Sequence, residues 1–253
     1  MRIPRRTRST LGGRGVDPPI HPSRPRQRAG AAIAWRLTAL GGLALAFPLA
    51  LPAAAGADVL DTASRFTARF DGALSAEQAG IVIANIGDQN ADGRPDFAVG
   101  VPEASNSARD NSGSVYILYA PATPGLIDLG ALAPTQGYRI DGADNFDATG
   151  SSVGPAGDVN GDGVMDILIG APGASNNDRN GSGTAWIIFG GARQKLLDLS
   201  MIGVNGIEID GAKAGDSLGA AVASAGDVNG DGAPDFLLGS PGTDIKGGTN
   251  SGS

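Results

Sequence analysis

The sequence predicts an all-β protein built from β-propeller blades, and three observations support this. One 14-residue pattern recurs three times, at intervals of 70 and 69 residues. Short apolar runs bounded by Gly, Pro, Asn and Asp flank each copy, which is typical of antiparallel strands. No segment shows a sustained helical apolar period with helix caps, so we expect few helices.

The repeated pattern occupies residues 87–100, 157–170 and 226–239. Each copy continues into Gly-x-Pro and a polar loop, and in the first two copies a β-rich run follows, at Ser114–Tyr119 and Thr184–Phe189. An apolar residue followed by Asp-Gly precedes each copy. These features define units at about residues 64–130, 134–203 and 204–253, of which the last is truncated.

A unit of this length with about four strands cannot bury both faces of its own sheet, so the units must pack against one another. Radial packing of four-stranded sheets gives a β-propeller. A linear β-solenoid is the alternative, but its repeats are much shorter. We therefore expect a partial β-propeller of about three four-stranded antiparallel blades over residues 58–253.

Residues 1–57 are predicted to be an Arg-rich leader with a secretory signal peptide. They hold nine Arg against one acidic residue, whereas residues 58–253 hold 10 basic and 25 acidic residues. An uncharged apolar run from Leu37 to Leu51 precedes Ala55-Gly-Ala57, which has the small-x-small form of a cleavage site. A membrane anchor is the alternative, but the run is shorter than the roughly 20 residues that a spanning helix needs.

The signal predicts a secreted, periplasmic or cell-surface protein with no stable membrane span after cleavage. Arg5-Arg6 suggests twin-arginine export, but the pair lies far upstream of the apolar run. A start site assigned too early explains the long basic stretch equally well. The general secretory route and the twin-arginine route therefore both stay open.

The composition excludes several kinds of site. The chain has no Cys, and its one His, His21, lies in the predicted leader. Residues 58–253 therefore lack a Ser–His triad, a Cys–His pair and the ligands that zinc and copper prefer. Their acidic balance repels phosphate, so we expect no nucleic-acid partner. We interpret Asp144, Asp147 and Asp216 as turn residues, and we expect no enzyme.

Each repeated pattern has the residues of a calcium loop. Loop positions 1, 3, 5 and 9 carry Asp or Asn, a Gly stands at position 6, and position 7 can supply a main-chain carbonyl. Calcium accepts about six to eight oxygen ligands at variable angles, whereas magnesium requires near-octahedral geometry. We therefore expect up to three structural Ca²⁺ ions. The candidate ligands are Asp88, Asn90, Asp92, Arg94, Asp96, Asp158, Asn160, Asp162, Val164, Asp166, Asp227, Asn229, Asp231, Ala233 and Asp235.

Two other interpretations of the loops are less favoured. An EF-hand needs a bidentate Glu at position 12 and flanking helices, but position 12 is Val99, Ile169 or Leu238 within apolar strand-forming runs. Ordinary Asx turns would explain single residues. They do not explain three carboxylates at constant spacing in three copies.

These loops, each followed by Gly-x-Pro, resemble FG-GAP repeats, the blades of the integrin α-subunit N-terminal propeller. The resemblance covers about residues 64–253. The Phe-Gly dipeptide of the name is replaced by Ala79-Gly80, Thr149-Gly150 and Leu218-Gly219. The resemblance implies a seven-bladed propeller with calcium in edge loops, and a role in adhesion or surface recognition.

The copy number predicts a fragment of such a propeller. Residues 242–253 align with residues 173–184, so the sequence stops where the run Ala185–Phe189 begins in the preceding copy. We expect the partner to be an extracellular protein or glycan. A propeller segment of a secreted hydrolase and a passive structural segment of a larger surface protein remain the alternatives.

Overall fold

The computed structural model is all-β in the residues that it describes, which are 68–73, 77–123, 125–191, 196–244 and 249–253. These ranges contain thirteen strands, three short 3₁₀ helices and no α-helix. They also contain no helix that is long and apolar enough to cross a membrane. The predicted leader and signal peptide lie outside the described residues.

The first sheet has five strands, of which four are antiparallel to one another. Its second and third strands pair so that Val99 lies opposite Tyr116. The antiparallel strands, in order across the sheet, are β2 (Val82–Asn85), β3 (Phe97–Val101), β4 (Ser114–Leu118) and β6 (Gly137–Asp141).

The second repeat forms an equivalent four-stranded sheet. Ile169 lies opposite Trp186, which is the register of the first sheet moved along by one repeat. The strands, in order across the sheet, are β7 (Ser152–Gly157), β8 (Asp166–Ala171), β9 (Thr184–Ile188) and β11 (Gly206–Asp210). The expected blade of four antiparallel strands is confirmed for these two repeats.

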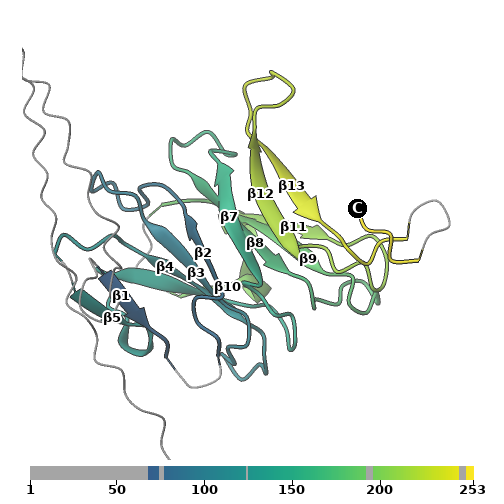
Figure 1. Ribbon diagram of the computed structural model, residues 1–253, viewed down its shortest axis with the longest axis horizontal. Coiled ribbons are helices and arrows are strands. Elements are labelled where there is room, and N and C mark those ends of the chain that lie inside the picture. The colour runs from purple at the N-terminus through teal and green to yellow at the C-terminus, as the bar shows by residue number, and fades with distance from the viewer. Residues whose placement is uncertain (1–67, 74–76, 124, 192–195, 245–248) are drawn as a thin grey trace, which may run out of the picture. The chain divides into compact units, whose positions relative to one another are not determined.

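The third repeat is described as a two-stranded antiparallel hairpin, β12 (Ala221–Gly226) and β13 (Asp235–Gly239). It lies beside β7 of the second sheet (Figure 1). Leu237 is 64% exposed, whereas the equivalent Leu168 of the second sheet is fully buried. The apolar face of the hairpin that points away from the second sheet therefore carries an exposed leucine.

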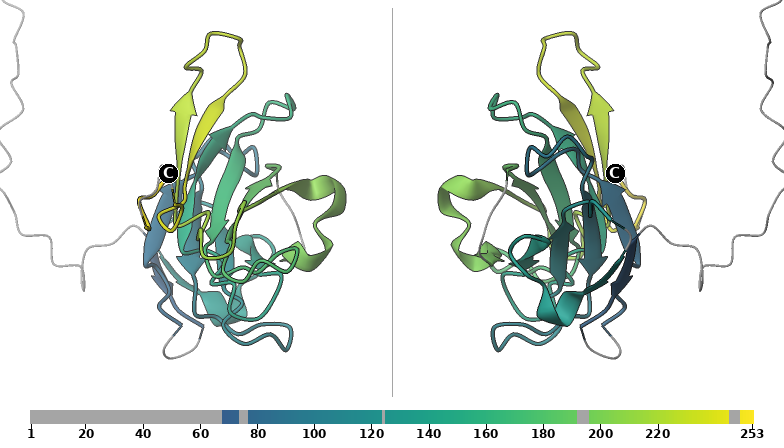
Figure 2. Two further views of the ribbon diagram at one scale, coloured as in Figure 1. Left: turned by 90° about the vertical axis from the view of Figure 1, so that its right-hand side faces the viewer. Right: turned by 90° about the vertical axis from the view of Figure 1, so that its left-hand side faces the viewer.

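The connecting segments add parallel pairings that the sequence analysis did not anticipate. β5 (Gly125–Asp128) pairs in parallel with β1 (Ala68–Asp71), and β10 (Leu197–Asp198) pairs in parallel with β6. A 3₁₀ helix follows each, η1 (Leu129–Ala131) and η2 (Leu199–Met201), and η3 (Gly203–Asn205) comes next. The η2–η3 segment lies on one flank of the sheets (Figure 2).

The sheets and the sequence units are offset by one strand. β6 belongs to the unit expected at residues 134–203, but it pairs with β4 of the preceding unit. β11 likewise joins β9. Each four-stranded sheet therefore takes its last strand from the next unit, which links successive blades through the chain itself.

Much of the core lies between successive sheets, so that both faces of the inner strands β8 and β9 are buried. Ile167 and Ile169 point into a cluster shared with the first sheet, whereas Leu168 points toward the third hairpin. All three side chains are fully buried. This explains why the strand reads as a continuous apolar run and not as an alternating one.

Candidate functional site

The three predicted calcium loops are the turns of three equivalent hairpins. Residues 88–96 join β2 to β3, residues 158–166 join β7 to β8, and residues 227–235 join β12 to β13. The hairpin tips follow one another at one end of the sheets (Figure 1). The fold therefore distributes the predicted ligands over three neighbouring loops and does not gather them into one site.

The first aspartate of each loop closes the turn by accepting hydrogen bonds from main-chain amides. Asp158 accepts from the amide of Asp162 at 3.0 Å and from the amide of Gly163 at 2.8 Å. Asp88 and Asp227 make the same two contacts in their loops. Gly163 has a φ of 88°, which a residue with a Cβ adopts only with strain.

The residues at positions 3 and 5 are hydrogen-bonded to one another. Asn160 Nδ2 donates to Asp162 Oδ2 at 2.9 Å, and the amide of Val164 donates to Asp162 Oδ1 at 2.8 Å. The amide of Val164, followed by the side chain of Asn160, holds the pKa of Asp162 below its ordinary value. The equivalent contacts lower the pKa of Asp231 in the third loop, with the amide of Ala233 as the larger cause. Both carboxylates are therefore charged at neutral pH.

The aspartate at position 9 fastens its loop to the third strand of the sheet. Asp166 accepts from the amide of Val159 at 2.8 Å and from the amide of Gly190, just after β9, at 2.7 Å. Asp96 makes the corresponding pair of contacts. Both side chains are fully buried. Burial raises the pKa of each above its ordinary value, against the effect of these hydrogen bonds. This structural role is not apparent from the sequence pattern.

The donor chemistry of the loops fits calcium. Each loop offers carboxylate and amide oxygens, and among the described residues no hydrogen bond is donated to the carbonyl oxygens at position 7, those of Arg94, Val164 and Ala233. Asp158 Oδ1 accepts from two amides. Asp158 Oδ2 and both carboxylate oxygens of Asp162 accept one hydrogen bond each and keep a further lone pair. The hydrogen bonds within the loops therefore do not exhaust the oxygens that a hard cation requires.

The spatial arrangement of the carboxylates does not match a metal site as their donor chemistry does. In the part of the chain that the structure describes, no group of three or more Asp, Glu, His or Cys side chains is placed so that it could hold a metal ion. The first and ninth aspartates of the second loop, Asp158 and Asp166, direct their oxygens at main-chain amides. The assignment of calcium to the loops stays a prediction.

Neighbouring loops contact one another through a glycine of the earlier loop and the residue at position 8 of the later one. A Cβ built on Gly157 would lie 2.4 Å from Pro234 Cβ, and one built on Gly87 would lie 3.2 Å from Met165 Cβ. Because Met165 and Pro234 occupy the same repeat position, the loops pack together in one repeated way.

The Gly-x-Pro elements mark a close approach between blades. A Cβ on Gly100 would lie 2.1 Å from the carbonyl oxygen of Gly150, and a Cβ on Gly170 would lie 1.9 Å from that of Gly219. Gly150 and Gly219 are the glycines of the degenerate Phe-Gly dipeptides. A side chain at Gly100 or Gly170 would collide with the main chain of the next blade, so only glycine fits at these positions.

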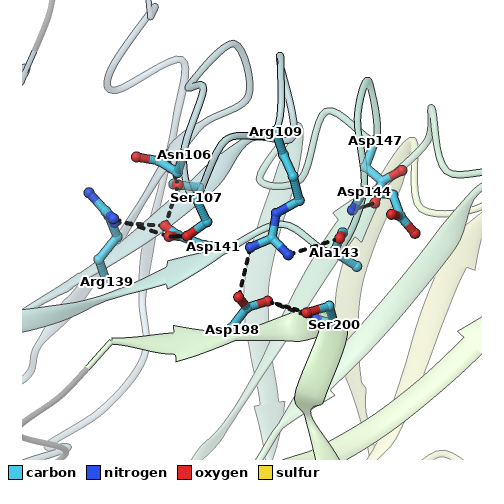
Figure 3. A network of polar contacts seen from close by, with 11 residues as sticks. Asn106, Ser107, Arg109, Arg139, Asp141, Ala143, Asp144, Asp147, Asp198 and Ser200 are labelled. Carbon is cyan, nitrogen blue, oxygen red and sulfur yellow. Dashed lines mark hydrogen bonds and ion pairs between the residues drawn. The ribbon is translucent and has the colours of Figure 1, made fainter.

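A polar network outside the loops closes the other end of the first sheet, and the sequence analysis missed it. Asp141, the last residue of β6, is fully buried and accepts hydrogen bonds from Ser107, Ser114 and Arg139. Arg109 lies beside this group (Figure 3). The signal was available in the sequence, because an arginine recurs at the equivalent position of the next repeat, Arg179.

Two of the aspartates interpreted as turn residues have that role. Asp147 accepts from the amide of Asp144 at 2.8 Å, and Asp216 accepts from the amide of Lys213 at 2.9 Å. Asp147 is almost fully buried. Burial, opposed by the hydrogen bond from Asp144, raises the pKa of Asp147 to about 6.

Comparison with known families finds the FG-GAP repeat at three places. The family model matches residues 80–118, 149–188 and 218–253. Each match begins two or three residues before the first strand of a sheet, β2, β7 or β12, and includes one predicted calcium loop. The first two matches end with the third strands, β4 and β9, and leave out the fourth strands, β6 and β11.

The curated relatives are of two kinds. Phosphatidylinositol-glycan-specific phospholipase D of Bos taurus is 33% identical over 159 residues, which cover 61% of this chain and 18% of the relative. Integrin alpha-IIb of Mus musculus is 28% identical over 195 residues, which cover 73% of this chain and 17% of the relative. Integrin alpha pat-2 of Caenorhabditis briggsae is 29% identical over 171 residues, which cover 12% of the relative. The chain spans less than a fifth of the length of these proteins.

Proposed function

The chain carries three FG-GAP repeats, and we propose that it is an exported calcium-binding repeat module with a role in adhesion or another protein interaction. One observation carries this proposal. The same oxygen-rich loop stands at the same hairpin turn in three successive repeats, and each loop contacts its neighbour. The relatives support it, since integrin alpha subunits are among them.

Calcium is structural in this proposal. When bound, it supplies positive charge that offsets the repulsion among the aspartates of a loop. The chain provides the ligands from positions 1, 3, 5, 7 and 9 of each loop. In the first two loops the buried ninth aspartate connects them to the end of the third strand. The consequence is a row of rigid hairpin tips that can present a binding surface.

Thermal unfolding with and without calcium tests the metal. Binding to the folded state alone stabilises a protein by about 2.7 kcal/mol per site at a hundredfold excess over Kd. We expect Ca²⁺ to raise the Tm by several degrees over the same protein in chelator, with a smaller effect of Mg²⁺ at equal ionic strength. An unchanged Tm at millimolar Ca²⁺ would contradict the proposal.

The interaction role is tested with surface ligands. We expect the exported chain to retain an extracellular protein or a glycan in calcium and to release it in chelator. Retention that is indifferent to chelator would contradict the proposed role of the loops. No retention of any matrix protein or glycan would support a passive structural segment instead.

Export is tested on the mature protein. We propose cleavage after Ala57, so N-terminal sequencing of the protein recovered from the medium or periplasm should begin at Asp58. A protein that is retained in the cytoplasm with residues 1–57 intact would contradict it.

A segment of a secreted hydrolase is the second candidate, because the relatives include a phospholipase D. The proposal that this chain is not itself an enzyme rests on the absence of Cys and on the position of its one His in the leader. Assays against phosphodiesters, glycosylphosphatidylinositol and glycans test it. Turnover that survives removal of residues 1–57 would overturn it.

A further inference from the structure

Gln89, at the second position of the first loop, reaches across to the second repeat. Its Nε2 donates to the carbonyl oxygen of Ile86 at 2.6 Å and to that of Met165 at 2.7 Å. Its Oε1 accepts from the amide of Gly191 at 2.9 Å. The side chain is only 2% exposed. Both donor hydrogens and the acceptor oxygen are therefore used, and two of the three contacts lie 76 and 102 residues away in the chain.

The near end of this bridge is part of the first loop. Gln89 stands between two predicted ligands, Asp88 and Asn90, and its main-chain amide donates to the last predicted ligand of the loop, Asp96, at 2.8 Å. Any ordering of the loop around a cation therefore orders Gln89. The side chain has no room to move independently, because it is buried and fully hydrogen-bonded.

The far end of the Gln89 side chain touches the second loop at Met165 and the segment after β9 at Gly191. Met165 lies between Val164 and Asp166, which are both predicted ligands of the second loop. Gly191 follows Gly190, whose amide donates to Asp166. Gln89 thus holds the two main-chain segments that position the ninth-position aspartate of its neighbour.

The other pair of loops provides an internal comparison. The second and third loops make the same kind of packing contact, between Gly157 and Pro234. They carry Val159 and Val228 where the first loop carries Gln89. A valine side chain cannot donate or accept a hydrogen bond, so the polar bridge is found between the first two loops and is absent between the last two.

We propose that Gln89 couples the first two loops, so that a divalent cation bound in one raises the affinity of the other. The inference rests on the proposed calcium function. A loop that is already ordered through its neighbour loses less conformational entropy when it binds its own ion, which produces positive cooperativity without a change of fold. The coupling is reciprocal. The second and third loops bind independently.

The test uses two variants of the full exported chain that retain two loops each. Asp231→Ala leaves loops one and two, and Asp92→Ala leaves loops two and three. Calcium titration calorimetry should give a Hill coefficient clearly above 1 for Asp231→Ala, with a coupling factor of about fivefold or more, and a coefficient of 1 for Asp92→Ala. Adding Gln89→Val, which installs the residue of the other two loops, should reduce the coefficient of Asp231→Ala to 1.

Hydrogen exchange provides a second readout, which reports on the hydrogen bond from Gly191 to Gln89 itself. In an Asp162→Ala protein, calcium can bind the first loop but not the second. Hydrogen exchange at the amide of Gly191, which donates to Gln89, should slow on adding calcium, and Gln89→Val should abolish this protection. If Gln89→Val fails to fold, Gln89→Met keeps the volume of the side chain and removes the three hydrogen bonds.

The outcomes separate the two proposals. Calcium binding with a Hill coefficient of 1 in both two-loop proteins, or cooperativity that survives Gln89→Val and Gln89→Met, overturns the coupling and leaves the calcium module intact. The absence of calcium binding in every protein overturns the proposed calcium function and the coupling with it.

Discussion

Arg109 Nη2 lies 2.8 Å from Asp198 Oδ2, an ion pair between residues 89 positions apart in the chain. Both side chains are largely buried, and Arg109 also donates to the carbonyl oxygen of Ala143 at 3.0 Å (Figure 3). Asp198 in addition accepts from Ser200 at the start of η2. The pair holds β10 against the first sheet, although the chain reaches β10 only after completing three strands of the second.

Loss of this ion pair should destabilise the protein. We expect Asp198→Asn to lower the free energy of unfolding by about 1–2 kcal/mol, because a hydrogen bond to a charged partner in a largely buried site is weakened. Asp71→Asn is the matched control, since Asp71 pairs with Arg69 at the surface and exposed pairs contribute little. Urea unfolding at pH 7 measures both. Equal losses in the two variants would contradict the role given to Arg109.

The same pair should make stability fall at low pH. Burial raises the pKa of Asp198, but the hydrogen bonds from Arg109 and Ser200 outweigh it and hold that pKa below its ordinary value of 3.8. This stabilisation is therefore present above pH 3.8 and is lost as the pH falls through the lower, folded-state pKa. Asp198→Asn should flatten that part of the acid-unfolding profile.

Asp147 should have the opposite effect in a different pH window. Its pKa is raised from 3.8 to about 6 in the folded state, so the folded protein binds a proton more tightly than the unfolded chain. The stabilising effect is fully present below pH 3.8 and is lost as the pH rises to about 6, by up to about 3 kcal/mol. Urea unfolding between pH 4 and pH 7 should show this decline.

Asp147→Asn is the test of that assignment. The amide oxygen can still accept from the main chain of Asp144, and the group no longer ionises. We expect the variant to be more stable than the wild type at pH 7 and its stability to vary less between pH 4 and pH 6. A profile that keeps the wild-type slope would assign the titration to another group.

Two glycine substitutions separate the energetic cost of disturbing the contact between successive loops from the cost of backbone strain. Gly157 and Gly161 both have positive φ, at 83° and 76°, but only Gly157 faces Pro234, and nothing lies within 4 Å of a Cβ on Gly161. Gly161→Ala should cost about 1–2 kcal/mol from backbone strain alone. Gly157→Ala should cost clearly more, because its Cβ would lie 2.4 Å from Pro234. Similar costs in thermal unfolding would show that the loops adjust to one another freely.

Removing one loop carboxylate at a time should remove one ion at a time. Asp92→Ala, Asp162→Ala and Asp231→Ala each delete the fifth-position ligand of one loop, and calcium titration should find one site fewer in each. Melting in chelator serves as the control for folding, because these exposed carboxylates contact only their own loop. An unchanged number of sites would place the ions elsewhere.

Local signals account for the repeat, the hairpins and the candidate loops. The β-rich runs predicted at Ser114–Tyr119 and Thr184–Phe189 match β4 and β9 to within one residue, because turn chemistry and alternation act between near neighbours. The glycines of Gly-x-Pro were equally visible. The reason that glycine is needed there is the close approach of Gly150 and Gly219, and the sequence does not show that approach.

Long-range pairings required the folded molecule. The sequence could not show that Ile140 lies in the first sheet, that β10 pairs in parallel with it, or that Gln89 and Arg109 reach into later parts of the chain. A strand such as β6 has the same local pattern whichever sheet it joins. Its partner is chosen by the burial of both sheet faces and by the satisfaction of buried polar groups such as Asp141, which depend on residues far apart in the chain.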